Sequence, residues 1–166
     1  GRSPDSAINT LIVHLNRYAK TYSKSAIYDS NFSTQDDFIY LINLKAFGKM
    51  TKMELIKKNV HDKPTGIQII NRLITLGYIA QIDSETDKRS KIINITDLGL
   101  EALSQQMNYI RQATQIVTGD LNYSEKMDLI RILNKLEHFH KPIFRQNIEV
   151  PKLLNTVLND FLPSQN

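Results

Sequence analysis

The stretch from Thr51 to Thr96 constrains the fold of this 166-residue chain more than any other part of the sequence. It reads as two short helices followed by two segments rich in β-branched residues on either side of a charged turn. The spacing of apolar residues changes from helical to alternating after Gly77, so we expect a helix-turn-helix followed by a β-hairpin. The fold class expected is mainly α with a small β-wing.

Local capping signals define the two helices. Thr51 and Glu54 have the spacing of a capping box, which predicts that a short helix begins there. Asp62 is expected to cap the second helix, which tolerates Pro64 in its first turn because no amide donor is needed there. Gly77 is expected to stop this helix, because glycine readily takes the left-handed conformation.

The second helix has two faces in the sequence. The buried stripe predicted from helical spacing consists of Ile67, Ile70, Leu73 and Ile74. The opposite, outer face is predicted to carry Thr65, Gln68, Ile69 and Arg72. A short helix, a tight turn and a longer helix with a polar outer face are typical of DNA-binding proteins, in which the second helix enters the major groove.

The hairpin is predicted from two alternating segments, 78–82 and 91–95. The turn between them has a polar tip that includes Asp87, Lys88, Arg89 and Ser90. This tip lacks the apolar content to pack, so we expect it to project into solvent or onto a ligand. Thr96 is expected to cap the next helix.

The turn residues 87–90, followed by Ile95-Thr96-Asp97-Leu98-Gly99, resemble the wing signature of the MarR family of bacterial winged-helix transcription regulators. By the order of elements, the resemblance extends over roughly residues 6–141. It implies that Arg89 enters the minor groove and that Asp87 orients it. It also implies a homodimer whose intertwined terminal helices hold two wings at the spacing of operator half-sites.

The sequence departs from the family pattern at two positions. Ile95 stands where the helix start usually has leucine, which is a mild change. Gly66 lies inside the recognition helix, where the family usually has a small β-branched residue. A glycine there costs roughly 1 kcal/mol relative to alanine, so we expect this helix to be loose until DNA orders it.

Positive charge is concentrated in the winged segment. Residues 45–96 hold ten Lys/Arg and five Asp/Glu, a net charge of 10 − 5 = +5, within a chain whose net charge is +4. Such a concentration is expected for a surface that faces phosphates, although a solvated basic face is the simpler reading of charge alone. The residues expected to bind DNA are Thr51, Lys52, Lys63, Thr65, Gln68, Arg72, Asp87, Lys88, Arg89, Ser90 and Lys91.

The remaining segments are expected to form helices around the winged core. Ser33 and Asp36 are expected to begin one helix, and Ser124 is expected to cap another that ends at Pro142. The expected organisation is an N-terminal dimerisation helix and loop (1–32), the winged region (33–96), C-terminal dimerisation helices (97–141) and a linker with an extra amphipathic helix (142–166). Dimerisation is assigned to Ile8, Leu11, Leu15, Ile130, Leu133, Leu153, Leu154, Val157, Leu158 and Phe161.

The extra C-terminal helix has a one-sided apolar stripe in a short segment, and such a helix is marginal alone. It is expected to pack on dimerisation helices; the alternative is a detachable docking helix. Because the family resemblance suggests small aromatic or anionic effectors between the dimerisation helices and the winged region, Tyr18, Tyr22 and Phe38 are candidates to line such a cleft. Ordinary core packing explains the same aromatic spacing.

Other classes of function find little support in the sequence. There is no cysteine, which removes disulfides, cysteine zinc clusters and thiol redox sensing. No enzyme motif is present, and we expect neither catalysis nor a cofactor nor a metal, although His14 or His140 across a dimer would be the place for one. No apolar run is long enough for a membrane span and no signal-peptide pattern begins the chain, so a cytoplasmic protein is expected.

The partners expected are double-stranded DNA and a second copy of the chain. The function expected is a sequence-specific transcriptional regulator acting on a pseudo-palindromic operator. The rival hypothesis is a winged-helix protein-interaction module whose basic face meets an acidic partner without reading DNA sequence.

Overall fold

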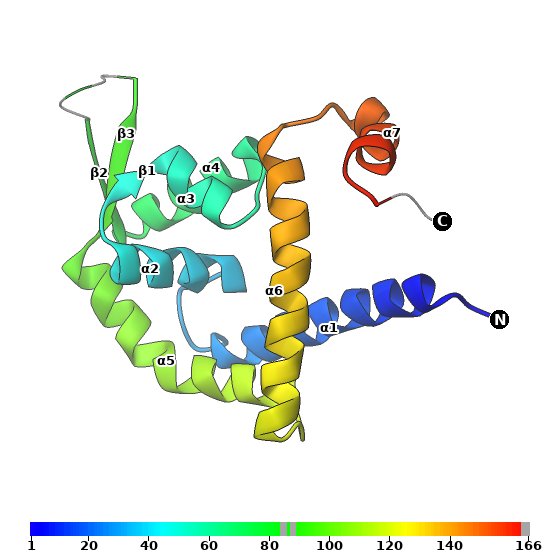
Figure 1. The fold of residues 1–166 in the computed structure, drawn as a ribbon. Coiled ribbons are helices and arrows are strands. Elements are labelled where there is room, and N and C mark those ends of the chain that lie inside the picture. Colours follow the sequence, from blue (N-terminus) through cyan, green and yellow to red (C-terminus); the bar gives the residue numbers. More distant parts are fainter. Residues whose placement is uncertain (84–85, 87–88, 164–166) are drawn as a thin grey trace. The chain divides into compact units, whose positions relative to one another are not determined.

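The computed structural model describes residues 1–83, 86 and 89–163. Its helices are α1 (Pro4–Ala26), α2 (Gln35–Phe47), α3 (Lys52–Lys58), α4 (Lys63–Thr75), α5 (Asp97–Thr118), α6 (Tyr123–Arg145) and α7 (Val150–Asp160) (Figure 1). Its strands are β1 (Met50–Thr51), β2 (Ile79–Asp83) and β3 (Lys91–Ile95). The expected fold class, mainly α-helical with a small β-wing, is confirmed. The chain divides into two compact units, residues 1–119 and 120–166.

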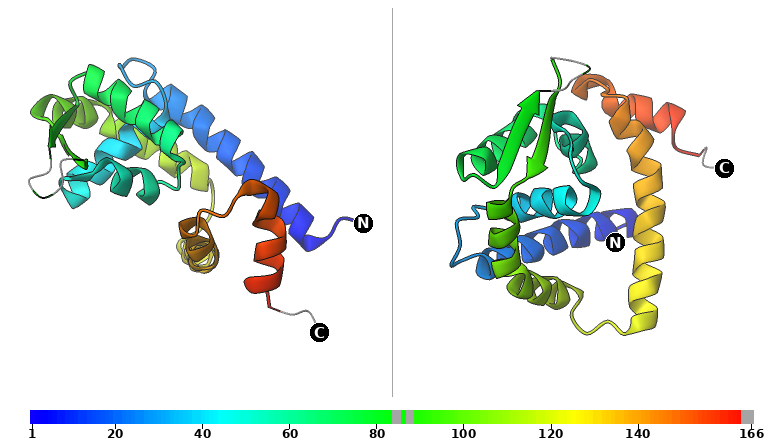
Figure 2. Two further views of the ribbon diagram at one scale, coloured as in Figure 1. Left: turned by 90° about the horizontal axis from the view of Figure 1, so that it is seen from above. Right: turned by 90° about the vertical axis from the view of Figure 1, so that its left-hand side faces the viewer.

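The core of the first unit lies where α2, α3, α4 and β3 meet. The large side chains that are fully buried there are Tyr40, Leu41, Leu44, Leu55, Ile56, Ile70, Leu73, Ile93 and Leu103. α5 contributes Leu103 to this core and packs along α1 (Figure 2). Burial of so much apolar surface makes this unit the part of the chain that holds its own shape.

The sheet has the order β1-β3-β2 and is antiparallel throughout. The wing strands pair in regular register, with Ile79 opposite Ile95 and Asp83 opposite Lys91. Sequence analysis did not predict β1, which is only two residues long and pairs Met50 with Ile93. This short strand places the start of α3 beside the base of the wing.

Three of the predicted helix caps are confirmed. The side chains of Thr51, Asp62 and Thr96 each accept a hydrogen bond from the backbone amide three residues later, at distances of 3.1, 2.8 and 3.0 Å. The capping box at Thr51 is half formed, because the carboxylate of Glu54 accepts from the Thr51 hydroxyl at 3.2 Å instead of from its amide. Gly77 has the predicted left-handed conformation, with φ of 79°.

Two other predicted helix starts are wrong. α2 follows Thr34, which makes no side-chain cap. The amide of Ser33 instead donates to Asp37 Oδ2 at 2.7 Å, so Asp37 and not Asp36 is the carboxylate that organises this helix start. α6 is capped by Asn122, two residues before the predicted cap Ser124, and Asn122 forms a complete capping box with Glu125.

The predicted end of α6 at Pro142 is also wrong, since the helix continues to Arg145. A proline this near the end of a helix removes one backbone hydrogen bond, and only the last turn depends on it.

The second unit buries little of its surface. In α6 the single buried residue is Ile143, and α7 has none. None of the helices described is long and apolar enough to cross a lipid bilayer.

Candidate nucleic-acid interface

The second helix of the helix-turn-helix, α4, is fixed to the core by its inner face. Ile70 and Leu73 are fully buried, and Ile67 and Ile74 pack against the core in part. The Asp62 carboxylate holds the first turn, and hydrogen bonds from the amide and hydroxyl of Thr65 lower the pKa of that carboxyl. The helix therefore begins at a defined residue with its outer face turned away from the core.

The structure explains why residue 66 is a glycine, which the sequence alone did not. A Cβ built at this position would lie 2.3 Å from Cγ1 of Ile56, whose side chain is fully buried on α3. Absence of a side chain lets α3 and α4 pack at close range. The glycine, which we had expected to loosen the recognition helix, thus closes the contact between the two helices of the motif.

The outer face of α4 is polar and exposed. Thr65 and Gln68 lie on it as expected, and Lys63 is exposed at its start. Ile69, which was assigned to this face, is buried at 4% exposure. Asn71 is exposed one helical step beyond Gln68 and was missed. Its spacing of three residues from Gln68 was the available signal, and its amide can pair with adenine in the major groove.

Arg72 does not share the outer face with Gln68. Its guanidinium binds the fully buried carboxylate of Asp37, with Nε 3.1 Å and Nη2 2.5 Å from Oδ1. The same carboxylate accepts from the Ser33 amide. A buried carboxylate needs such a partner, so Arg72 ties α4 to α2. We therefore withdraw the expectation that Arg72 reads a base.

The turn between α3 and α4 is also tied to α2. The hydroxyl of Tyr40 lies 2.6 Å from Nδ1 of His61, and Nε2 of His61 lies 3.8 Å from the Asp36 carboxylate. Burial, followed by the charges of Asp36 and Asp62, raises the pKa of Tyr40, so the phenol keeps its proton in this hydrogen bond with the imidazole. Together with the Arg72–Asp37 ion pair, this contact holds α4 against α2 near both ends of α4.

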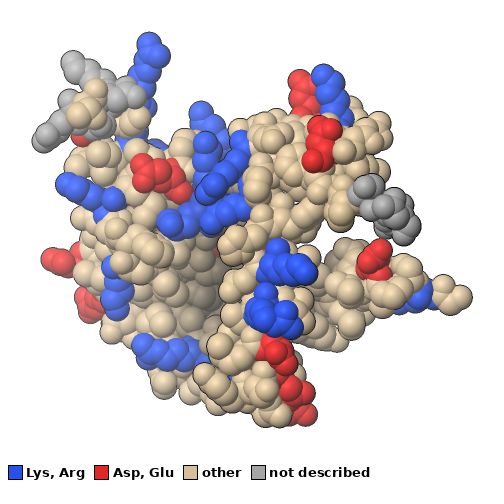
Figure 3. Space-filling view, in the orientation of Figure 1, with Lys and Arg blue, Asp and Glu red and all other residues tan. Residues whose placement is uncertain are grey.

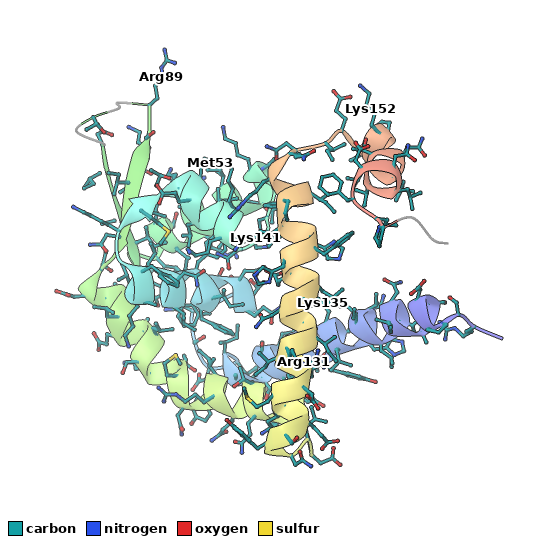
Figure 4. The ribbon with its side chains drawn as sticks, viewed as in Figure 1. Met53, Arg89, Arg131, Lys135, Lys141 and Lys152 are labelled. Carbon is teal, nitrogen blue, oxygen red and sulfur yellow. The ribbon has the colours of Figure 1, made fainter. Side chains whose placement is uncertain are left out.

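The wing projects from the same unit. Arg89 lies at the end of the hairpin and extends outward in Figure 4. Ser90 is half-buried beside it. Lys91 forms an ion pair with Asp83 across the two strands. Asp87 and Lys88, which were expected to take part in the wing contact, lie outside the described residues.

A pair of lysines joins the wing to the helix-turn-helix. Lys52 begins α3 directly after Thr51, and Lys91 begins β3, whose next residue pairs with Thr51. Partial burial and then the charge of Lys91 lower the pKa of Lys52. Two cations held near each other repel, so an anion such as a phosphate would be favoured between them.

Further cations border α3. Lys49, Lys57 and Lys58 are exposed, and the ammonium of Lys58 lies 4.2 Å from the ring centroid of Phe47. Figure 3 shows Lys and Arg side chains gathered around α3 and α4. These three lysines contribute to the charge excess of residues 45–96, but sequence analysis did not single them out.

The three aromatic residues expected to line an effector cleft differ widely in burial. Phe38 is buried in the core, Tyr22 packs against it in part, and Tyr18 is 53% exposed beside His14. The first unit instead has a polar hollow of about 290 Å³, lined by Tyr28, Asp29, Ser30, Asn31, Phe32, Tyr78, Ala102, Gln105 and Gln106. It lies between the α1–α2 loop, the residue before β2 and the first half of α5.

Many residues assigned to dimerisation are exposed apolar side chains. Exposure is 52% for Ile8, 57% for Leu11 and 41% for Leu15 on α1. On α6 it is 49% for Ile130 and 45% for Leu133. On α7, Leu154 and Leu158 are exposed, whereas Leu153, Val157 and Phe161 are half-buried.

Comparison with known proteins gives consistent matches. A profile of the MarR family matches residues 31–90. The HTH-type transcriptional repressor NicR of Pseudomonas putida is 27% identical over 103 residues, which is 62% of this chain and 65% of NicR. The aligned part thus spans less than two thirds of that relative.

Solved structures share the fold. Bordetella bronchiseptica BpsR, whose DNA binding is regulated by 6-hydroxynicotinic acid, superposes with a TM-score of 0.73 at 22% identity, covering 79% of this chain and 98% of BpsR. A mutant MarR from E. coli complexed with operator DNA gives 0.71 at 21% identity, with coverage of 78% and 93%. PcaV from Streptomyces coelicolor, in complex with its natural ligand, gives 0.74 at 15% identity, with coverage of 83% and 96%.

The profile match covers α2, β1, α3, α4 and β2 and ends just before β3, so it includes most of the elements that build the interface described above. Residues 31–90 thus match the MarR family profile, and the chain shares the winged helix-turn-helix fold of these solved structures.

Proposed function

We propose that this protein is a sequence-specific DNA-binding transcriptional regulator that works as a homodimer in the cytoplasm. The observation that carries the proposal is the outer face of α4, where Thr65, Gln68 and Asn71 are exposed while the inner face is locked into the core. A rigid helix with amides on its outer side suits base readout in the major groove.

The lysines around α4 supply the complementary charge for the DNA backbone. Lys52 and Lys91 adjoin at the base of the wing, and Lys57, Lys58 and Lys63 are exposed around the two helices. Contacts of this kind position a protein on the duplex without reading its sequence. Arg89, which extends outward from the wing, would read minor-groove width and potential.

The exposed apolar side chains of α1 and α6 support the homodimer. An apolar stripe that repeats along a long helix needs a partner surface, and monomers rarely expose such patches. A second copy would also supply the second recognition helix that a pseudo-palindromic operator requires.

The function is tested by a mobility-shift assay with the DNA upstream of the protein's own gene, at several salt concentrations. We expect tight and steeply salt-dependent binding, at least tenfold tighter than to a scrambled duplex. Gln68→Ala should remove roughly 1–3 kcal/mol of that preference. Arg89→Ala should weaken binding to both duplexes and make the salt slope shallower by about one unit.

Lys20→Ala, an exposed change on α1, is the matched control and should alter neither quantity. Equal affinity of the wild-type protein for both duplexes would argue for the protein-interaction module instead.

We propose the polar hollow beside Tyr78 as the effector site. Asn31, Gln105 and Gln106 offer amide donors and acceptors, and Tyr78 leads directly into β2, so a bound molecule could act on the wing. The carboxylate of Asp29 favours a neutral ligand over an anionic one.

6-Hydroxynicotinic acid and its neutral amide are suitable first probes, measured by thermal shift and by release of DNA. We expect the amide to bind more tightly, and Gln105→Ala to weaken it. Binding that survives Gln105→Ala and Gln106→Ala together would place the effector elsewhere.

A further inference from the structure

A second row of cations runs along α6, outside the winged segment. We name Arg131, Lys135, Lys141 and Arg145 the α6 stripe. All four are exposed, and at 3.6 residues per turn they fall within an arc of about 120°. Figure 4 shows three of them along the helix, and Figure 3 shows basic side chains over its middle, with acidic ones nearer its beginning.

The opposite side of α6 is apolar. Leu129, Leu133 and Leu136 are 41%, 45% and 37% exposed and lie roughly across the helix from the stripe. In the proposed homodimer this side would be covered by the second copy. The α6 stripe would then remain outward and free to meet a different partner.

Helix stability does not account for the stripe. Cations near a helix C-terminus are favoured by the dipole, but this effect is confined to the last turn, where Lys141 and Arg145 lie. Arg131 and Lys135 are far from that end. Moreover, Arg131–Lys135 and Lys141–Arg145 are like charges four residues apart, which disfavours the helix. The acidic residues at favourable spacing, Asp128 and Glu137, form none of the ion pairs found in the described chain.

The stripe is also without neutralising partners in the described chain. The four ion pairs found there involve His61–Asp36, Arg72–Asp37, Lys91–Asp83 and Lys152–Glu149, and none includes a stripe residue. His138, on the same side of α6, directs its Nδ1 to the backbone carbonyl of Asn134. A row of repelling cations is stabilised when an external polyanion binds along it.

We propose that the α6 stripe binds the phosphate backbone of duplex DNA independently of sequence, as a contact additional to the winged interface. The stripe is about 21 Å long from Arg131 to Arg145. Over that length one DNA strand presents about six phosphates, enough for all four cations. The contact would raise affinity for long DNA and the chance that the protein finds its operator.

An anionic membrane fits the geometry less well. A helix that lies on a bilayer buries its apolar side among the lipid chains. On α6 that side would be covered by the second copy in the proposed homodimer, so it would not be available to lipid. Duplex DNA can meet the stripe while the apolar side stays covered.

The test compares two full-length variants that each lose four positive charges. The stripe variant carries Arg131→Gln, Lys135→Gln, Lys141→Gln and Arg145→Gln. The control carries Arg17→Gln, Lys24→Gln, Arg111→Gln and Lys152→Gln, which are exposed positions spread over α1, α5 and α7. Both change the net charge from +4 to 0, and glutamine is a good helix former.

Affinity for a long duplex of scrambled sequence is measured against salt concentration. We expect the stripe variant to lose about three units of salt slope, and the control to keep that of the wild type. Circular dichroism and the sedimentation mass of both variants should match the wild type, which excludes loss of fold. Slopes that are equal for stripe variant and control overturn the proposal. A defect seen with anionic vesicles but not with the duplex overturns it as well.

This experiment separates the stripe from the proposed regulatory function. Operator preference is read from the ratio of specific to scrambled binding, which the stripe variant should leave unchanged. If the wild type shows no such preference while the stripe variant still loses slope, the regulatory function fails and the α6 stripe stands.

Discussion

α4 and α6 have equally regular apolar spacing, yet the structure places them in opposite situations. On α4, Ile70 and Leu73 are fully buried against α2 and α3. α6 is 23 residues long and buries only Ile143, while Leu133 remains 45% exposed. A helical stripe therefore shows that a helix has a face to cover, but not what covers it.

The difference separates two kinds of stability. The winged segment contains its own packing partners and should respond to changes in its interior as an ordinary core does. α6 requires something more than the described chain provides, so changes on its apolar side should alter association before they alter local structure. Four measurements test this distinction.

The largest effect is expected from Arg72→Gln, which leaves the carboxylate of Asp37 buried without its cation. We expect the free energy of unfolding to fall by roughly 3–5 kcal/mol, measured by guanidinium denaturation. Lys63→Gln, an exposed change on the same helix, should stay within about 0.5 kcal/mol of the wild type. A similar loss of unfolding free energy in both variants would mean that the Arg72–Asp37 ion pair does not stabilise the winged segment.

Leu133→Glu tests whether a second copy of the chain covers the apolar side of α6. A charge in the covered face should convert the dimer to monomer and reduce operator affinity at least 100-fold, which is about 2.7 kcal/mol. Sedimentation equilibrium gives the mass and a shift assay gives the affinity. Asn134→Glu, about 100° round the helix from Leu133 and within the arc of the α6 stripe, should keep the dimer mass. A Leu133→Glu protein that stays dimeric would show that α6 is covered in another way.

Gly66→Ala addresses the close contact between α3 and α4. The added methyl would meet Ile56 at 2.3 Å, and we expect a net loss of about 2 kcal/mol despite the better helix propensity of alanine. Thermal unfolding provides the measurement. In a double-mutant cycle with Ile56→Ala, the two changes should couple favourably by about 1 kcal/mol. If the two losses of stability simply add, contact with Ile56 is not what excludes a side chain at position 66.

The smallest effect is expected at Lys52. Its pKa is lowered in the free protein by partial burial and by Lys91, and a bound phosphate would raise it. The complex then holds more protons than the free protein, so affinity should fall as pH rises from about 8 to about 10. In Lys52→Arg the side chain stays charged over that pH range, so this variant should not show the part of the fall in affinity that Lys52 causes. If the affinities of the wild type and of Lys52→Arg depend on pH in the same way, Lys52 does not contact the DNA backbone.

Much of the winged segment could be predicted from the sequence because its signals are local. Thr51, Asp62 and Thr96 bind amides only three residues away, so the residues themselves carry the information. Gly77 ends α4 by its own conformation. The hairpin follows from alternation within two short segments.

Several features that the sequence did not predict depend on residues far apart in the chain. Asp36 and Asp37 are equivalent as sequence, and only the approach of Arg72, 35 positions later, distinguishes them. β1 is too short to give a pattern and exists because β3 pairs with it. The effector hollow likewise combines a loop, Tyr78 and α5.

The amino-acid order is enough to predict where most helices and strands of this protein begin, which faces are polar and where positive charge concentrates. These properties arise from hydrogen bonds and periodicities within a few residues. The pairing of Arg72 with Asp37 and the close contact of Gly66 with Ile56 become visible only in the folded chain. Each of those contacts is created by a partner that packing brings within a few ångströms, and no local pattern specifies that distance.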